Sequence, residues 1–222
     1  MSASTTPVAP ARDRSRSGPR RTREEKYDER RTQLAESALA TLGELGYART
    51  SLREIAQNSE FTHGVVHYYF ASKTELIVHC VRYYKAKCVT RYDDVIAQST
   101  SADELAERFA DKLVETLTDE APMHRLWYDL RTQSMFDDEF RDDVMAIDRT
   151  LEQMIARVLQ RYSELAETPL AFDSTTAYAL LDGVFEKAVL GHLAGQPQAL
   201  AELRSRALDV LPILLDSPSA RI

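Results

Sequence analysis

Two histidines, a glycine and a tyrosine fall together in a short polar and aromatic stretch in the first half of the chain. The spacing of His63, Gly64, His67 and Tyr68 places them on one face of a helix. Imidazole nitrogens can donate or accept hydrogen bonds at base edges, a tyrosine ring adds apolar contact and a hydroxyl, and glycine allows close backbone approach. This face therefore predicts direct reading of DNA, with packing against another helix as the open alternative for Gly64.

The same histidines can do other chemistry, because a pair at i and i+4 can ligate a metal. The zinc-hydrolase pattern requires Glu directly after the first His, whereas Gly64 follows His63. Neither a G-x-S-x-G motif nor a phosphate-cradling glycine loop nor a cysteine cluster occurs elsewhere in the sequence. We therefore expect no enzyme, no cofactor and no catalytic metal, while metal sensing remains an alternative.

The elements that must position this face are two short helices and one longer one. Ser51 begins an S-x-x-E capping box for a helix that should end near Asn58, and Thr62 can cap the next helix. A longer helix over residues 28–45, ending before Gly46, can pack across both. This arrangement is typical of a helix-turn-helix unit, whose second short helix enters the major groove.

The remainder of the chain also shows helical periodicity, without convincing β alternation or internal repeats. The sequence therefore predicts an all-α fold, in which the N-terminal helix-turn-helix unit is followed by a larger helical part. The further helices are expected over residues 73–97, 101–117, 122–133, 140–162, 174–193 and 200–214.

Charge divides the chain unequally. Residues 1–92 carry 16 Lys and Arg against 10 Asp and Glu, whereas residues 93–222 carry 12 against 25. A basic first part favours contact with a polyanion. Residues 1–25 contain six Arg and few large apolar side chains, so they are expected to form a disordered arm that follows DNA or serves as a solvated tail. Since no apolar stretch approaches about 20 residues, we expect a cytoplasmic protein without a membrane partner.

The run TSLREIAQNSEFTHGVVHYYFASKTEL, residues 50–76, resembles the DNA-binding signature of the tetracycline-repressor (TetR) family. The resemblance implies a disordered arm over 1–25, a helix-turn-helix domain over 26–76 and a ligand-binding and dimerisation domain over 77–222. It also implies a ligand-responsive regulator, most often a repressor, that binds a palindromic operator as a homodimer and is released by a small-molecule inducer. A helical protein-interaction or metal-sensing protein is the alternative.

The resemblance assigns roles to residues of the signature. Positions that meet phosphate match Thr50, Ser51, Tyr69 and Lys73, and Thr62 begins the DNA-reading helix. Positions that face bases match His63, Gly64, Val65, His67 and Tyr68, whereas Val66 and Phe70 match core positions. Two residues depart from the family: Glu60 stands at the turn where Gly is frequent, and His67 stands where Tyr is commonest.

The second domain should hold the inducer. Candidate pocket residues come from an aromatic and methionine-rich segment, in which rings can stack, thioethers can adapt and a guanidinium can bind an anion. These candidates are Met123, Trp127, Tyr128, Arg131 and Met135, with Phe109 and Phe185 as weaker ones. Packing in the core is the alternative for all of them.

The helix at 174–193 is apolar on too many sides for one protomer to cover. With the last helix it is therefore expected to form a four-helix bundle with a second copy. The predicted interface residues are Leu181, Val184, Phe185, Leu203, Ala207 and Leu211. More weakly, residues 179–193 are similar to the dimerisation helix of the choline- and betaine-responsive subgroup. The helix at 73–97 is expected to transmit the ligand state to the DNA-reading helices.

Overall fold

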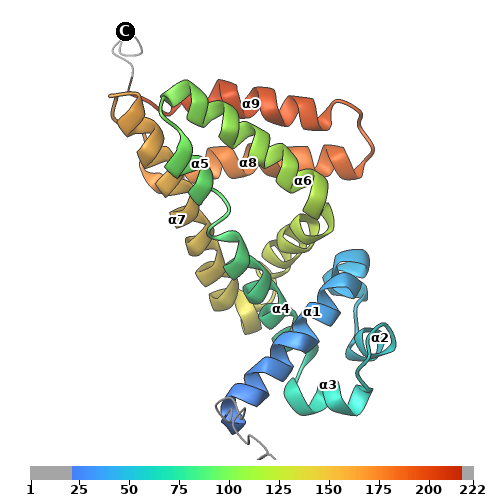
Figure 1. Cartoon of the computed structure of the whole chain (residues 1–222). Helices are drawn as coiled ribbons and strands as arrows, with labels where there is room; N and C mark the ends of the chain where they lie inside the picture. Colours follow the sequence, from blue (N-terminus) through green and yellow to red (C-terminus); the bar gives the residue numbers. More distant parts are fainter. Residues whose placement is uncertain (1–21, 217–222) are drawn as a thin grey trace, which may run out of the picture.

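The structure, a computed structural model, describes residues 22–216 and is helical through almost all of them (Figure 1). The elements are α1 (Arg23–Arg49), α2 (Leu52–Gln57), α3 (His63–Tyr69), α4 (Lys73–Cys88), α5 (Asp93–Gln98), α6 (Ala102–Gln133), the 3-10 turn η1 (Asp138–Phe140), α7 (Arg141–Leu165), α8 (Ser174–Leu193) and α9 (Ala199–Ile213). Over residues 22–216, extended pairing is limited to a single bridge between Leu170 and Leu215. The predicted all-α class is confirmed.

Helix α1 begins earlier than its apolar periodicity indicates. Thr22 caps it, and Thr22 and Glu25 form a reciprocal capping box in which each side chain accepts from the other's backbone N–H. Residues 22–25 are thus part of an ordered helix start, which corrects the inner end of the predicted arm. The rest of that arm, residues 1–21, lies outside the described residues. Gly46 adopts φ 75°, so the predicted stop is a kink before the end of α1.

Two further helix boundaries differ from the expectation. The helix predicted over 73–97 ends at Cys88, and α5 begins at Asp93 after a turn. Tyr92 ends that turn and is buried against Phe109, with ring centroids 5.0 Å apart. Conversely, the two helices predicted over 101–117 and 122–133 are one helix, α6, with non-helical backbone at Glu120 just before Pro122. Proline removes one helical hydrogen bond and here bends the helix without ending it.

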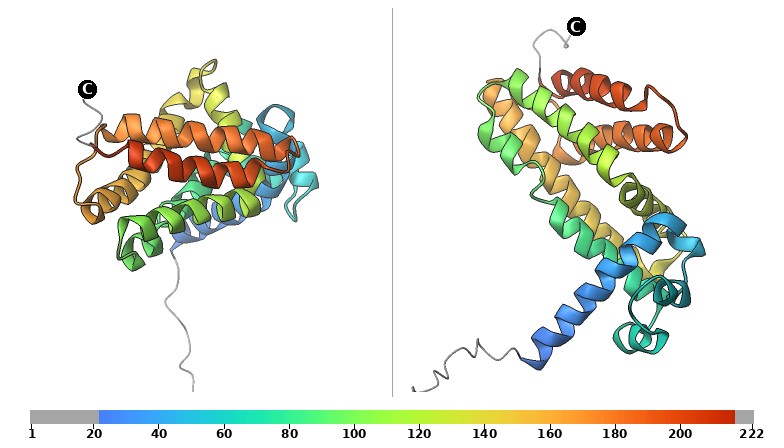
Figure 2. Two further views of the ribbon diagram at one scale, coloured as in Figure 1. Left: turned by 90° about the horizontal axis from the view of Figure 1, so that it is seen from above. Right: turned by 45° about the vertical axis from the view of Figure 1, so that its right-hand side comes forward.

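Helices α1–α4 gather at one end of the molecule and α8 and α9 lie at the other, joined by the long α6 and α7 (Figure 1). The first helix packs on both α4 and α6. At the far end α8 and α9 lie side by side, and both contact α6 (Figure 2). The predicted domain boundary at residue 76 falls within the first turn of α4 and stays a prediction. None of the helices between residues 22 and 216 is long and apolar enough to cross a membrane.

Candidate DNA-binding surface and ligand pocket

The short helices α2 and α3 are both fixed by side-chain caps. The Ser51 Oγ accepts from the Glu54 backbone N–H at 3.2 Å, and Glu54 Oε2 accepts from the Ser51 N–H at 2.7 Å. Thr62 Oγ1 accepts from the Val65 N–H at 3.4 Å at the start of α3. Helices of six and seven residues are marginal alone. The caps and the core beneath therefore hold them in place.

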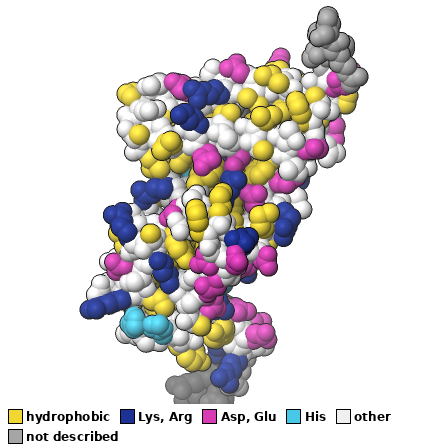
Figure 3. Space-filling model, turned by 180° about the vertical axis from the view of Figure 1, so that it is seen from behind, with side chains coloured by type: hydrophobic (Ala, Val, Ile, Leu, Met, Phe, Trp, Pro, Cys, Tyr) yellow, Lys and Arg dark blue, Asp and Glu magenta, His cyan; other side chains and the backbone are white. Residues whose placement is uncertain are grey.

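The two faces of α3 differ sharply. Val66 and Phe70 are fully buried, which confirms their predicted core positions, and the Arg31 guanidinium lies 4.5 Å above the Phe70 ring. On the opposite face His63, Gly64 and His67 are exposed, and Tyr68 is 67% exposed. Histidine side chains reach the surface near the α1–α4 end of the molecule (Figure 3). The structure thus brings the predicted base-facing residues together on one open face.

Nothing else in the described chain approaches Gly64. A Cβ built at this position would meet no heavy atom within 4 Å, so packing against another helix does not explain this glycine. Glu60 in the preceding turn does not take the left-handed conformation that glycine favours, since Glu167 is the one non-glycine residue between 22 and 216 with positive φ. The turn between α2 and α3 therefore accommodates Glu60 without that strain.

A tyrosine cluster links α3 to the start of α1. The Tyr69 ring lies 4.9 Å from the Tyr27 ring and 5.0 Å from the Tyr68 ring, measured between centroids. Tyr69 is half-buried by these contacts, and Val65 is half-buried against the core. These two predicted DNA-binding residues therefore lie at the margin of the open face, where they also orient α3.

The residues predicted to meet phosphate lie in different environments. Thr50 is buried and its hydroxyl donates to the Gly46 carbonyl at 2.7 Å, so its side chain closes the end of α1 and is not available to phosphate. Ser51 is exposed. The Lys73 Nζ lies 4.4 Å from the Tyr47 ring centroid and 3.5 Å from the Ala48 carbonyl oxygen. Burial lowers the pKa of Lys73.

The exposed histidines are also candidates for metal ligands. The rings of His63 and His67 lie 4.4 Å apart between centroids, close to edge-on. Between residues 22 and 216, no group of three or more His, Cys, Asp or Glu side chains is arranged to hold a metal ion. The pair has no third protein ligand in this part of the chain, and structural sites for zinc usually take four.

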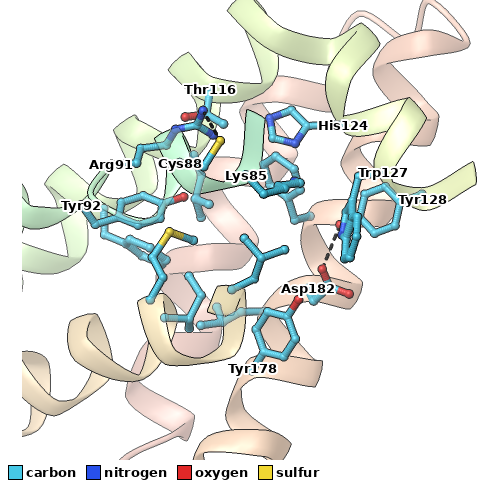
Figure 4. Close-up of a pocket in the computed structure, with 17 residues that line it drawn as sticks. Lys85, Cys88, Arg91, Tyr92, Thr116, His124, Trp127, Tyr128, Tyr178 and Asp182 are labelled. Atoms are coloured by element: carbon cyan, nitrogen blue, oxygen red, sulfur yellow. Dashed lines mark hydrogen bonds between the residues drawn. The ribbon is translucent and has the colours of Figure 1, made fainter. Parts of the chain in front are cut away.

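A separate cavity of about 70 Å³ lies between α4, α6, α7 and α8 (Figure 4). The part of its wall that carries polar groups consists of Lys85, Cys88, Arg91, Thr116, His124 and Asp182. Its apolar and aromatic wall includes Tyr92, Leu113, Leu151, Met154, Ile155 and Tyr178. A single water needs roughly 10–15 Å³. The cavity therefore has room for a small molecule or the polar end of a larger one.

Four of the seven predicted ligand residues line this cavity: Phe109, Trp127, Tyr128 and Phe185. The other three do not. The Met123 methyl group lies against Gly43 of α1, and Met135 is 71% exposed beyond the end of α6. Arg131 does bind an anion, but that anion is the Asp182 carboxylate, at 2.5 Å from Nη1. The aromatic and methionine-rich segment thus predicted Trp127 and Tyr128, whereas its methionines and Arg131 lie outside the cavity lining.

Two pairs of opposite charges are matched at the cavity. Asp182 accepts from Arg131 and from the Tyr128 hydroxyl, the latter at 3.0 Å. Arg91 forms an ion pair with Glu120 at the bend of α6, and the Tyr84 hydroxyl donates to the same carboxylate. Arg91 Nη2 also lies 3.2 Å from the Cys88 Sγ, and burial raises the pKa of that thiol. Cys88 is thus held as a thiol beside a guanidinium.

Lys85 is different, because it has no matching charge. It is only 5% exposed, and among residues 22–216 its Nζ forms no ion pair or hydrogen bond. Its contacts are ring faces, with the Nζ 5.1 Å from Trp127 and 5.4 Å from Tyr84. Burial lowers the pKa of Lys85 to about 8. A desolvated cation–π contact provides about 2 kcal/mol, whereas removing an ammonium from water costs several kcal/mol. The ring contacts therefore do not offset the burial of the Lys85 charge.

Two further polar atoms beside Lys85 lack partners. His124 Nε2 and Trp127 Nε1 are both buried without a hydrogen bond. Burial lowers the pKa of His124 to about 2, so the ring is neutral at pH 7. Sequence reasoning missed Lys85, Cys88, Arg91, His124 and Asp182. One signal was present: Lys85 follows Val81 by four residues and precedes Cys88 by three, which puts a lysine on the apolar stripe of its helix.

The predicted dimer residues are mostly occupied within the protomer. Leu203, Ala207 and Leu211 are buried in the core beneath α9, and Leu181 lines the cavity. Val184 and Phe185 are half-buried against the same core. The apolar residues that α8 and α9 do expose are Leu180, Leu190, Leu193 and Ile213. The predicted helices thus carry an apolar outer surface, while Leu203, Ala207 and Leu211 face inward because α9 packs on α6. For Val184 and Phe185 a place in the interface stays a prediction.

Comparison with known proteins supports one family. The family model described as "Bacterial regulatory proteins, tetR family" matches residues 34–80. A relative named HTH-type transcriptional regulator BetI, from Burkholderia cenocepacia (strain HI2424), is 26% identical over 190 residues, covering 85% of this chain and 95% of its own.

Solved structures share the fold. FadR from Bacillus subtilis in complex with stearoyl-CoA has a TM-score of 0.64 at 19% identity, over 81% of this chain and 96% of its own. A putative transcriptional regulator from Saccharomonospora viridis in complex with choline has a TM-score of 0.67 at 18% identity, over 85% of this chain and 98% of its own. Both align over most of their own length, so the likeness covers most of the fold.

Proposed function

The chain belongs to the TetR family of transcriptional regulators, and from this premise we propose that it represses transcription by binding a palindromic operator as a homodimer. A small-molecule ligand in the cavity between α4, α6, α7 and α8 releases it. DNA is then the macromolecular partner, the site of action is the cytoplasm, and no reaction is catalysed. The observation that carries this proposal is the open face of α3, which packs on the protein only through its other side.

Base reading is assigned to the exposed residues of that face. His63 and His67 offer nitrogens to base edges in the major groove, and Tyr68 offers its ring and hydroxyl. Gly64 allows the start of α3 to approach the duplex, since no protein atom occupies the space above it. Val65, at the margin of the face, adds apolar contact of the kind that thymine methyl groups favour.

Phosphate contacts are assigned to the residues at the rim of α3. Ser51 and Thr62 are exposed at two helix starts, where backbone N–H groups favour an anion. Tyr69 and Lys73 flank the end of α3, and Lys73 supplies the positive charge. Thr50 is assigned no phosphate contact, because its hydroxyl donates to the Gly46 carbonyl at the end of α1. Contacts of this kind contribute affinity that depends on salt more than on base sequence.

Dimerisation is assigned to the outer surface of α8 and α9. Leu190 is 64% exposed, Leu193 lies beside it one turn later, and Leu180 is exposed earlier on α8. Ile213 adds an exposed apolar side chain at the end of α9. Large apolar side chains grouped on a surface mark an interface, and two helices from each copy give the four-helix arrangement expected from the sequence.

The ligand acts on DNA binding through α4. This helix begins with Lys73 beside the DNA surface and carries Lys85 and Cys88 in the cavity at its other end. It packs on α1 and on α7, so a shift of its cavity end changes the placement of α3. Release follows if the ligand binds better to the state in which the two α3 helices of the dimer do not match successive major grooves.

Selection of binding sites from random duplex DNA tests this proposal. The wild-type protein should recover an inverted repeat, and the double variant His67→Ala/Tyr68→Ala should recover none or a different one. Phe136→Ala is the matched control, because it removes an aromatic side chain that is 84% exposed but lies far from α3 in sequence. If the wild type recovers no sequence and shows no salt-sensitive binding, the proposal is wrong and a protein-interaction role takes its place.

A further inference from the structure

The cavity contains one charge that the protein does not neutralise. Arg91 is paired with Glu120, and Asp182 is paired with Arg131. Only Lys85 faces the cavity without an ionic partner among the described residues. With a pKa of about 8, it still keeps most of its proton at neutral pH. The empty space beside it is therefore positive.

The unpartnered polar atoms lie around the same space. The Trp127 indole Nε1 can only donate a hydrogen bond, and the Lys85 ammonium can only donate. His124 is neutral and its ring donates to the Thr116 backbone carbonyl, so the one ring N–H lies on Nδ1 and Nε2 is an acceptor. Figure 4 shows His124, Lys85 and Trp127 next to one another along one side of the cavity. A group that satisfies both Lys85 and Trp127 must accept hydrogen bonds.

Aromatic and aliphatic side chains cover the opposite wall. Leu151, Met154 and Ile155 come from α7, and Leu181 comes from α8. These side chains offer no charge and fit an apolar body of limited size. The cavity thus combines a donor-rich end with an apolar end, an arrangement that orients a ligand carrying one acidic group.

We infer that the ligand of this cavity is a small organic anion whose carboxylate binds the Lys85 ammonium, with a further hydrogen bond from Trp127 Nε1. The inference rests on the proposed function, since it names the class of inducer for the same cavity. It also separates this chain from its structural neighbour in complex with choline. A quaternary ammonium would meet Lys85 at close range with no free carboxylate to offset it, because Arg131 and Tyr128 already hold Asp182.

The only tryptophan of the chain lies in this cavity, so its fluorescence reports binding directly. The full-length protein, without DNA, is titrated at constant ionic strength and pH 7 with acetate, hexanoate and benzoate. Each is paired with its amide, which keeps the shape and removes the charge, and choline is titrated in parallel. At least one carboxylate should bind tenfold or more tightly than its amide, and choline should bind more weakly than that carboxylate.

Lys85→Met and Lys112→Met provide the matched variants. Lys112 lies on α6 in an exposed ion pair with Glu115 and does not line the cavity. Lys85→Met should abolish the preference for carboxylate over amide, whereas Lys112→Met should keep it. The inference is overturned if no carboxylate exceeds its amide in the wild type, if choline binds best, or if Lys85→Met keeps the preference. Because these titrations contain no DNA, such a result would leave DNA binding untouched, and the selection of binding sites tests the proposed function separately.

Discussion

The face of α3 and the cavity between α4, α6, α7 and α8 contain similar side chains with different surroundings. On α3, a helix of seven residues, His67 and Tyr68 are neighbours in sequence and both are exposed. In the cavity, His124 and Trp127 are buried, and the lysine beside them lies about 40 residues earlier in the chain. The polar groups of the α3 face are in contact with water, whereas those of the cavity are buried away from it. Histidine and aromatic side chains thus occur in both regions, and what differs between the regions is their burial.

The largest expected effect separates the two sides of α3. Phe70→Ala removes a fully buried ring from the core and should lower the free energy of unfolding by about 3–5 kcal/mol. Tyr68→Ala, two residues earlier on the exposed face, should change it by no more than about 0.5 kcal/mol. Chemical denaturation of both variants measures the difference. Equal losses would show that Tyr68 supports the fold and is not held free for DNA.

The next effect concerns the unmatched charge of the cavity. Below pH 8 both the native and the unfolded chain keep the Lys85 proton, and the native state bears the cost of burying it. Between pH 8 and pH 10.5 the native state loses this proton while the unfolded chain keeps it, so the free energy of unfolding rises with pH. The full rise amounts to about 3 kcal/mol.

Lys85→Met isolates this contribution, because Cys88 and the cavity tyrosines titrate in both proteins. Denaturation of both proteins at pH 7 and pH 10 measures their free energies of unfolding. The variant should be the more stable one at pH 7, and this difference should be smaller at pH 10. If the difference between the two proteins does not depend on pH, burial of the Lys85 ammonium does not destabilise the native state and the contrast between the two regions fails.

A smaller effect is expected at the rim of α3. Lys73→Met should weaken binding to all DNA sequences about equally and reduce the slope of log affinity against log salt by about 1. The control is Lys112→Met, whose slope should match the wild type. A change in preferred sequence without a change in slope would move Lys73 from phosphate contact to base reading.

The smallest effect is expected at Gly64, where one substitution should raise stability and lower operator affinity. Gly64→Ala should raise the free energy of unfolding by about 0.5–1 kcal/mol, because alanine is the better helix former and the added methyl meets no protein atom. Operator affinity should fall, since that methyl occupies space meant for the duplex. Thermal unfolding and fluorescence anisotropy measure the two quantities. A stabilised variant with unchanged operator affinity would remove Gly64 from the DNA contact.

The helix-turn-helix unit was predictable because its signals are local. Ser51 and Thr62 cap the short helices as their sequence patterns predict, and Val66 and Phe70 face inward. Helix ends were less predictable where distant contacts decide them. Tyr92, after the end of α4, packs against Phe109, and Glu120 at the bend of α6 accepts from Tyr84 of α4 and from Arg91 in the following turn.

The cavity was only partly predictable, for a related reason. An aromatic segment of α6 predicted Trp127 and Tyr128, but the lysine that faces them lies on α4 and Asp182 lies on α8. Residues on different helices cannot be matched by helical spacing, so the sequence did not predict that they line one cavity. The same limit applies to Leu203, Ala207 and Leu211, because their face of α9 is apolar for packing on α6.

The central claim is that the outer face of α3 reads bases, and one ratio tests it most directly. The affinity for the selected operator is divided by the affinity for unrelated duplex DNA, for wild type and for His67→Ala/Tyr68→Ala, at several salt concentrations. We expect this ratio to fall at least tenfold in the variant while the salt slope on unrelated DNA stays the same. An unchanged ratio would contradict the account, because His67 and Tyr68 would then contribute nothing to specificity.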